Sequence, residues 1–332
     1  MFDFSVVVCT YNGAARLPAV LAQLRSQRST PFKWEVLIVD NNSQDETAAL
    51  VRQQQQSWLA DVPLRYTFEP RQGLAYARRC AVSQLHSHLI GFIDDDTLPD
   101  PDWVQQAYAF AQRHPEVGAY GSDIRGQYAV EPPPNFERIA SCLAIIQRGD
   151  RPFRYGVSGV LPAGAGMVVR RQAWLSCVPK HPILKGVCGP SLNAKGEDVE
   201  TLSYLRERGW PIWHNPQMRL THQIPPSRLT SAYLLHLFQQ IGLSRYPLRR
   251  LRYRWWQRPV MLGLHGVNDL RKLLKHIVKT RQLIPRDVVT ACERTLLIHS
   301  LISPFYAARV RVSTPLQPPL ETPLDPSPYG IS

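Results

Sequence analysis

The sequence lacks several features that would assign it to a class at once. No window of about 18 residues is uninterruptedly apolar, so no membrane-spanning helix is predicted. The six cysteines are scattered, without a CxxC pair or zinc-finger spacing, which predicts reduced thiols in a cytosolic protein. A phosphate-binding GxxxxGKS/T loop is absent. A strand-like stretch begins at Phe4 without a preceding basic segment, so we expect no secretory signal.

Positive charge is concentrated in one part of the chain. The net charge is +13, and residues 226–313 carry 16 lysines and arginines against 3 acidic residues, whereas the remainder is balanced. The change from balanced to positive charge begins beside Pro225 and Pro226, where we predict a domain boundary. We therefore expect a large domain over residues 1–225, a basic helical extension over 226–313 and a proline-rich disordered tail over 314–332.

The large domain alternates buried strands with helical stretches. Apolar runs at residues 4–9, 34–39 and 89–93 each end in polar residues, and the apolar side chains of residues 17–24 have helical spacing. A repeated order of a strand, a polar strand end and a helix is typical of an open α/β sheet. Ligands of such sheets bind at the carboxyl ends of the strands, so the polar strand ends are candidate site residues.

Three consecutive aspartates close the third apolar run. Successive side chains of a strand point to opposite faces, so Asp94 and Asp96 would share one side and Asp95 would take the other. Two carboxylates at a strand end, completed by a substrate diphosphate, could bind Mg²⁺ or Mn²⁺. The alternative is an acidic turn that stabilises the N-terminus of the helix expected after Pro101.

Six short motifs together resemble those of family 2 glycosyltransferases in order and approximate spacing. They are Val8–Asn12, Val39–Asp45, Gly73–Arg78, Asp94–Asp96, Gly164–Arg171 and Gly196–Glu200. The resemblance covers about residues 4–224 and is specific to the family, though not to the sugar. It implies a bacterial polysaccharide-biosynthesis enzyme of GT-A fold, with a mixed, mainly parallel sheet flanked by helices. It also implies an inverting reaction that uses a nucleotide-activated sugar and a divalent cation, Mn²⁺ or Mg²⁺.

The resemblance also implies roles for individual residues. Those lining the nucleotide-sugar pocket would be Thr10, Tyr11, Asp40, Gly73, Arg78, Asp94 and Asp95. A carboxylate can accept an imide N–H from uracil or thymine, and a tyrosine ring can stack on a base, so the residue types suit the task. The metal would be held by Asp96, Asp94 and His222. The alternatives are a helix-entry turn for Asp40 and a packed or surface histidine for His222.

A second acidic cluster starts at Gly196. Apolar residues follow it at helical spacing, so Glu197 and Asp198 would open a helix, where acidic residues are common without any catalytic role. In related enzymes the second acid of this pair is the general base. The resemblance therefore assigns proton abstraction to Asp198 and an acceptor-orienting role to Glu197. Arg79 and Gly166 stand where many members have asparagine, and neither receives a role.

The basic extension has the pattern of a surface helix. From Leu270 to Lys279, five apolar residues lie on one helical face and four basic residues on the other, and residues 246–258 interleave five arginines with two tryptophans. A cationic face, an apolar stripe and interfacial tryptophans suit an anionic membrane surface. The alternative is that the stripe packs on the large domain and the charges are solvated.

These inferences predict transfer of a sugar from a nucleotide-diphosphate donor to a hydroxyl of a glycan or lipid-linked acceptor, in the cytoplasm or peripherally on the inner face of the plasma membrane. A metal-dependent nucleotidyl- or phosphotransferase would also need paired aspartates, but leaves the cluster at Gly196 unexplained. A non-enzymatic nucleic-acid-binding protein would explain residues 246–279 and none of the carboxylate sites. We therefore expect no nucleic-acid partner.

Overall fold

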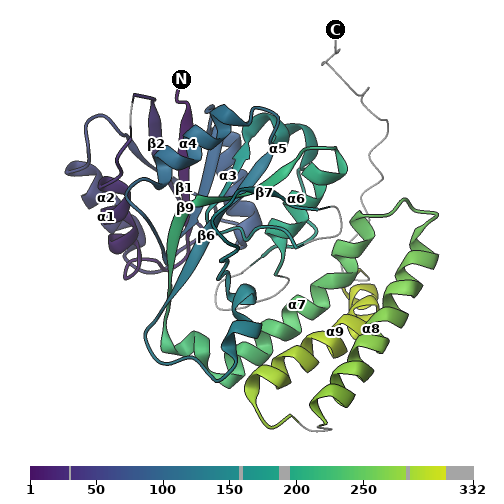
Figure 1. Cartoon of the computed structure of the whole chain (residues 1–332). Helices are drawn as coiled ribbons and strands as arrows, with labels where there is room; N and C mark the ends of the chain where they lie inside the picture. Colours follow the sequence, from purple (N-terminus) through teal and green to yellow (C-terminus); the bar gives the residue numbers. More distant parts are fainter. Residues whose placement is uncertain (30, 157–159, 187–194, 282–284, 312–332) are drawn as a thin grey trace.

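The computed structural model describes residues 1–29, 31–156, 160–186, 195–281 and 285–311. Figure 1 shows a central sheet flanked by helices, with the helices α7, α8 and α9 gathered beside it. The proline-rich tail predicted at 314–332 lies outside the described residues.

In the described part of the chain, nine strands form one mixed sheet in the order β3-β2-β1-β4-β8-β6-β9-β5, and β7 pairs with β9. The strands are β1 (Phe4–Thr10), β2 (Trp34–Asp40), β3 (Leu64–Phe68), β4 (Leu89–Asp94), β5 (Thr97–Pro99), β6 (Ala119–Tyr128), β7 (Phe153–Arg154), β8 (Met167–Arg170) and β9 (Ile212–Ile224). Strands β1 to β4 run parallel, and β8 joins them antiparallel to β4. The mainly parallel half of the sheet thus comes from the first 94 residues.

The first strands form where apolar runs can be buried on both faces. Every residue of β1 and β2 is buried, as expected for central strands of a parallel sheet covered by helices. Their register pairs Thr10 with Asp40, and β4 is aligned so that Cys9 pairs with Asp94. The polar strand ends therefore lie at one edge of the sheet, as the sequence predicted.

Helices cover both faces of the sheet, and the sheet separates two hydrophobic cores. The helices are α1 (Leu17–Arg25), α2 (Thr47–Gln56), α3 (Leu74–Gln84), α4 (Trp103–Arg113), α5 (Arg171–Cys177) and α6 (Glu197–Glu207). Leu17 of α1, Val51 of α2 and Trp103 of α4 share one core. Ala77 of α3, Trp174 of α5 and Leu202 of α6 share the other. The predicted α/β architecture is confirmed.

The described residues between 226 and 311 are mainly helical, as predicted, but they are joined to the first domain by a third core. The helices are η3 (Pro226–Leu229), α7 (Ser231–Leu251), α8 (Arg258–Thr280) and α9 (Val288–Arg311). Leu234 and Val289 of these helices pack with Phe136 and Leu143, which belong to the short 3-10 helices η1 (Phe136–Arg138) and η2 (Ala140–Leu143). The extension therefore shares its core with residues that precede the predicted boundary.

None of the helices in the described part of the chain combines the length and apolarity needed to cross a bilayer. The five described cysteines are all free, whereas Cys188 lies outside the described residues.

Candidate active site

A cavity of about 530 Å³ opens at the carboxyl ends of β1 and β4, a volume typical of small-molecule sites. The predicted site residues that line it are Thr10, Tyr11, Asp94, Asp95, Asp96 and His222. Lining residues that the sequence did not single out include Arg16, Asn41, Leu143, Arg228, Tyr233 and Leu237. The helical extension thus contributes part of the cavity wall, because Arg228 lies on η3 and Tyr233 and Leu237 lie on α7.

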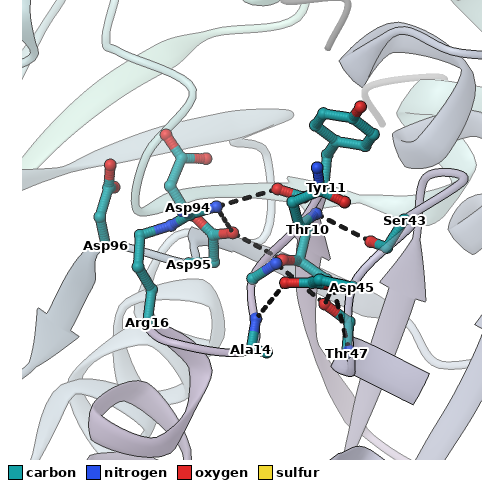
Figure 2. Close-up of polar contacts among 12 residues, drawn as sticks. Thr10, Tyr11, Ala14, Arg16, Ser43, Asp45, Thr47, Asp94, Asp95 and Asp96 are labelled. Carbon is teal, nitrogen blue, oxygen red and sulfur yellow. Dashed lines mark hydrogen bonds and ion pairs between the residues drawn. The ribbon is translucent and has the colours of Figure 1, made fainter. Parts of the chain in front are cut away.

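Asp95 is held in place by protein groups. Its carboxylate accepts bonds from Arg16 Nε at 3.0 Å and Arg16 Nη2 at 2.8 Å, and from Thr10 Oγ1 at 2.6 Å. Figure 2 shows Asp95 turned toward Arg16 and Thr10, while Asp94 and Asp96 extend to the other side. Asp95 and Asp96 lie in the turn between β4 and β5, so the extended backbone on which the predicted alternation rested ends at Asp94. Asp95 fixes the cavity wall rather than offering free oxygen atoms.

Asp96 and His222 face each other across the pairing of β5 with β9. Asp96 Oδ1 lies 3.5 Å from His222 Nε2, and Asp96 Oδ2 lies 2.6 Å from Arg228 Nη2. Burial alone would raise the pKa of the Asp96 carboxyl, but the positive charge of Arg228 is the largest opposing cause, and the pKa stays below its ordinary value. Asp96 is therefore a carboxylate at neutral pH.

The donor set at Asp96 fits a divalent cation. Asp96 Oδ1 is buried and has no hydrogen-bond partner, so one hard oxygen atom is available. His222 Nδ1 lies 2.9 Å from the Leu143 carbonyl oxygen. Donation of an Nδ1–H to that oxygen makes Nε2 the acceptor, and in this structure Nε2 accepts from Arg228 Nη1 at 3.1 Å, so Arg228 would have to move before Nε2 could bind a cation. The described residues contain no cluster of three or more such ligands, so a substrate diphosphate would have to complete the shell.

Arg78 connects the aspartate triplet to the second acidic cluster. Its guanidinium, only 3% exposed, lies 3.6 Å from Asp94 Oδ1 and 3.1 Å from Glu197 Oε1. It also lies over the Phe92 ring, 5.5 Å from the centroid. Arg78 is not among the residues that line the cavity, and its predicted approach to the donor stays a prediction. It acts as the buried counter-ion between two carboxylates.

The second acidic cluster opens α6, as predicted. Asp198 Oδ2 accepts the Gly164 N–H at 2.8 Å, and Asp198 Oδ1 accepts the Val199 N–H at 2.7 Å. Glu197 is buried, and burial together with the neighbouring Asp198 raises the pKa of the Glu197 carboxyl despite the Arg78 charge. Neither carboxylate lines the cavity, but the shared contact with Arg78 places the cluster next to it.

Gly164 has a steric reason to be glycine. A Cβ on Gly164 would lie 2.4 Å from Arg78 Nη2 and 2.7 Å from Arg78 Nη1, closer than any side chain can approach. The Gly164 N–H is the group that binds Asp198. The small-residue loop therefore lets the backbone reach the buried arginine and the α6 carboxylate at once.

Asp40 and Gly73 make hydrogen bonds within the protein and do not line the cavity. The Asp40 carboxylate accepts the Ser43 N–H at 2.8 Å and the Tyr66 hydroxyl at 2.9 Å, and it does not line the cavity. Burial and the bond to Asp40 raise the pKa of Tyr66 to about 12. Asn41 faces the cavity instead, and its Oδ1 accepts the Gly73 N–H at 2.8 Å. The predicted roles of Asp40 and Gly73 in nucleotide binding stay predictions.

The loop that carries Tyr11 is tied to the loop after β2. The Asn12 N–H donates to Ser43 Oγ at 2.9 Å, and the Ala14 N–H donates to Asp45 Oδ2 at 3.1 Å. Figure 2 shows the Tyr11 ring standing clear of this network. The backbone of the loop is thus fixed while the ring remains free to stack on a ligand.

Comparisons with known proteins agree on one family. The model of "Glycosyl transferase family 2" matches residues 5–174. Glycosyltransferase AglE of Haloferax volcanii is 31% identical over 102 residues, which are 31% of this chain and 33% of AglE. The likeness to AglE therefore spans about a third of that relative. The glucosyl-dolichyl phosphate glucuronosyltransferase of the same organism is 22% identical over 311 residues, 90% of this chain and 96% of that protein.

Solved structures show the same fold. A mannosyltransferase from Pyrobaculum calidifontis, solved with GDP-Man and Mn²⁺, matches with a TM-score of 0.56 and 17% identity over 95% of this chain and 76% of its own. This likeness confirms the predicted GT-A fold. Because the family model matches just over half of the 332 residues, the chain belongs to glycosyl transferase family 2.

Proposed function

We propose that the protein is a metal-dependent, inverting glycosyltransferase that moves a sugar from a nucleoside diphosphate to a hydroxyl group of a glycan or lipid-linked acceptor. The observation that carries the proposal is the buried Asp96 Oδ1, which makes no hydrogen bond and lies 3.5 Å from His222 Nε2, in the lining of a cavity that could hold a nucleotide. Family membership favours sugar transfer over nucleotidyl transfer and over nucleic-acid binding.

The donor nucleotide would occupy the cavity at the ends of β1 and β4. The free Tyr11 ring offers a stacking face for the base, and Thr10 keeps Asp95 in place below it. Arg16 and Arg228 bring positive charge to the same wall, which suits the phosphates of the donor. These contacts would bind and orient the donor before any bond changes.

Asp96 and His222 would hold the divalent cation together with the donor diphosphate. Asp94, predicted as a further ligand, does not form a three-ligand cluster with them among the described residues and would have to approach the cation when the donor binds. When bound, such a cation supplies positive charge that stabilises the departing diphosphate. Arg228, which pairs with Asp96 Oδ2 in this structure, would be free to pair with a phosphate oxygen instead once the cation takes over the carboxylate.

Asp198 would act as the general base. Its carboxylate takes the proton of the acceptor hydroxyl while the hydroxyl oxygen bonds to the anomeric carbon. The bond from that carbon to the diphosphate oxygen breaks on the opposite side, and its electron pair leaves with the nucleoside diphosphate. One such displacement inverts the anomeric centre. Glu197, fixed by Arg78, would hold the start of α6 and orient the acceptor.

The acceptor class is proposed from relatives. The relative that matches over 96% of its length is named for a glucosyl-dolichyl phosphate, and another, ExoM of Rhizobium meliloti, is named for succinoglycan biosynthesis. We therefore extend the proposal to a lipid-linked or growing polysaccharide acceptor. The site residues alone name neither the sugar nor the nucleotide.

The test is to follow both halves of a labelled donor. UDP-, GDP- and dTDP-sugars, each labelled either in the sugar or in the β-phosphate, are incubated with Mn²⁺ and with lipid-linked or polysaccharide acceptors. The proposal expects sugar label in the product and phosphate label in the released nucleotide. Transfer of the phosphate label to the acceptor would show a phosphotransferase and contradict the proposal.

A further inference from the structure

One face of α8 is apolar and open to solvent. Its side chains are between 48% and 75% exposed, namely Val260, Leu264, Val267, Leu270, Leu274 and Val278. They follow one another at intervals of three or four residues, so they form one continuous stripe along the helix. Soluble monomers seldom expose such a continuous apolar row without a partner.

The stripe points away from the rest of the extension. Asp269, which is fully buried, pairs through both carboxylate oxygens with the guanidinium of Arg249 on α7. At about 100° per residue, Val260, Val267 and Val278 lie on the side of the helix opposite Asp269. Figure 1 shows α8 at the outer edge of the extension, beside α9. This exposed stripe therefore does not pack on the large domain, whereas Leu273 and Ile277 of the predicted apolar face are half-buried.

The charges around the stripe are positive. Arg271, Lys272, Lys275 and Lys279 of the same helix are all exposed. The three acidic residues of the extension are engaged within the protein, because Asp269 pairs with Arg249, Glu293 pairs with Arg138, and Asp287 accepts the Thr290 N–H. A second copy of this surface would bring like charges together, whereas an anionic lipid surface would be complementary.

Two tryptophans extend the same kind of surface. Trp255 and Trp256, in the turn between α7 and α8, are 79% and 57% exposed. Indole rings favour the boundary between lipid head groups and acyl chains, because they combine a large apolar face with one N–H donor. Together with the stripe and the four cations of α8, they define what we call the α8 face.

We propose that the α8 face docks the protein on an anionic lipid bilayer. The stripe would enter the head-group boundary, while Arg271 and the three lysines reach lipid phosphates. The purpose we assign to docking rests on the proposed function, because a docked enzyme would hold its cavity near a lipid-linked acceptor. Helix α7 makes that link, because Tyr233 and Leu237 near its start line the cavity and its far end leads to Trp255.

The test is cosedimentation with vesicles of phosphatidylcholine, with and without phosphatidylglycerol. The full chain should bind only the anionic vesicles. Replacing Arg271, Lys272, Lys275 and Lys279 by glutamine should weaken binding by up to about 10³-fold at low salt, because each basic residue near such a surface contributes about 1 kcal/mol. The double variant Leu274→Gln, Val278→Gln should weaken it at least about tenfold, because glutamine cannot enter the apolar layer.

A matched control uses exposed apolar residues of the large domain. Val130→Gln with Leu175→Gln changes the same residue types at positions 45% and 55% exposed and should leave vesicle binding unchanged. Equal binding by all variants would overturn the proposal. So would a lower thermal midpoint of the Leu274, Val278 variant, or a wild-type dimer that this variant dissociates. Donor hydrolysis without vesicles is measured in parallel, so that loss of docking is distinguished from failure of the proposed catalysis.

Discussion

At the scale of single residues, the site depends on three carboxylates with different environments. Asp95 is saturated by Arg16 and Thr10, Asp96 keeps one partnerless oxygen atom, and Asp198 is bound by backbone N–H groups. These differences assign different tasks to residues that look alike in the sequence. They also allow each task to be removed separately.

Replacing Asp96 by alanine should weaken Mn²⁺ and donor binding together. The change removes the oxygen ligand and releases Arg228, so isothermal titration should show both affinities falling. Asp61→Ala, at an exposed position between α2 and β3 that is not among the cavity residues, is the control and should change neither affinity. Donor affinity that is unchanged in the Asp96 variant, with Mn²⁺ present, would exclude Asp96 as a metal ligand.

Asp198→Asn should separate catalysis from binding. Asparagine has nearly the same shape and keeps one acceptor oxygen, but it cannot take the proton of an acceptor hydroxyl. Turnover should fall by roughly 10²-fold or more, with little change in donor affinity. A loss of donor affinity as large as that of the Asp96 variant would show that Asp198 has been assigned wrongly.

At the scale of elements, the loop at Gly164 joins two clusters that lie far apart in the sequence. Arg78 on α3 binds Asp94 of β4 and Glu197 of α6, and Gly164 provides the space that its guanidinium fills. The loop therefore couples the strand end to the helix that carries Asp198.

Gly164→Ala should displace Arg78 and disturb both clusters. Overpacking of this kind costs about 1–3 kcal/mol of the free energy of unfolding, measurable by urea denaturation, and activity should fall with it. Gly156→Ala is the matched control, because nothing lies within 4 Å of the Cβ that it would add. Equal stability of the two variants would mean that the Arg78 guanidinium moves aside without cost.

The elements also show what the sequence could and could not predict. The runs that became β1, β2 and β4 were recognisable because buried parallel strands need unbroken apolar residues, and their aligned ends predicted the cavity residues Thr10 and Asp94. The partners Arg16 and Arg228 were missed, because a pairing across about 80 or 130 residues leaves no periodic signal. Asp40 was placed at the correct strand end, but its bond to Tyr66 depends on how β3 pairs with β2.

At the scale of the whole molecule, the extension is part of the folded unit that contains the site. It supplies Arg228, Tyr233 and Leu237 to the cavity and packs on Phe136 and Leu143. The exposed ion pair between Arg138 and Glu293 also crosses the predicted boundary. A shared core predicts that the two parts unfold together.

Leu234→Ala should therefore destabilise the whole chain. Leu234 is fully buried in the third core, and truncation of such a residue costs about 2–5 kcal/mol. Calorimetry should show a single transition at a lower temperature, whereas Leu175→Ala, at a position 55% exposed, should scarcely move it. Two transitions, with only one shifted, would show that residues 226–311 fold independently.

The most direct measurement of the proposed chemistry is the anomeric configuration of the product. Once a donor is found, the purified product is examined by proton NMR, in which the coupling constant at the anomeric hydrogen distinguishes the two configurations for suitable sugars. Displacement assisted by Asp198 alone predicts that an α-linked donor gives a β-linked product. An α-linked product would contradict the single displacement, and with it the roles assigned to Asp198 and to the site around Asp96.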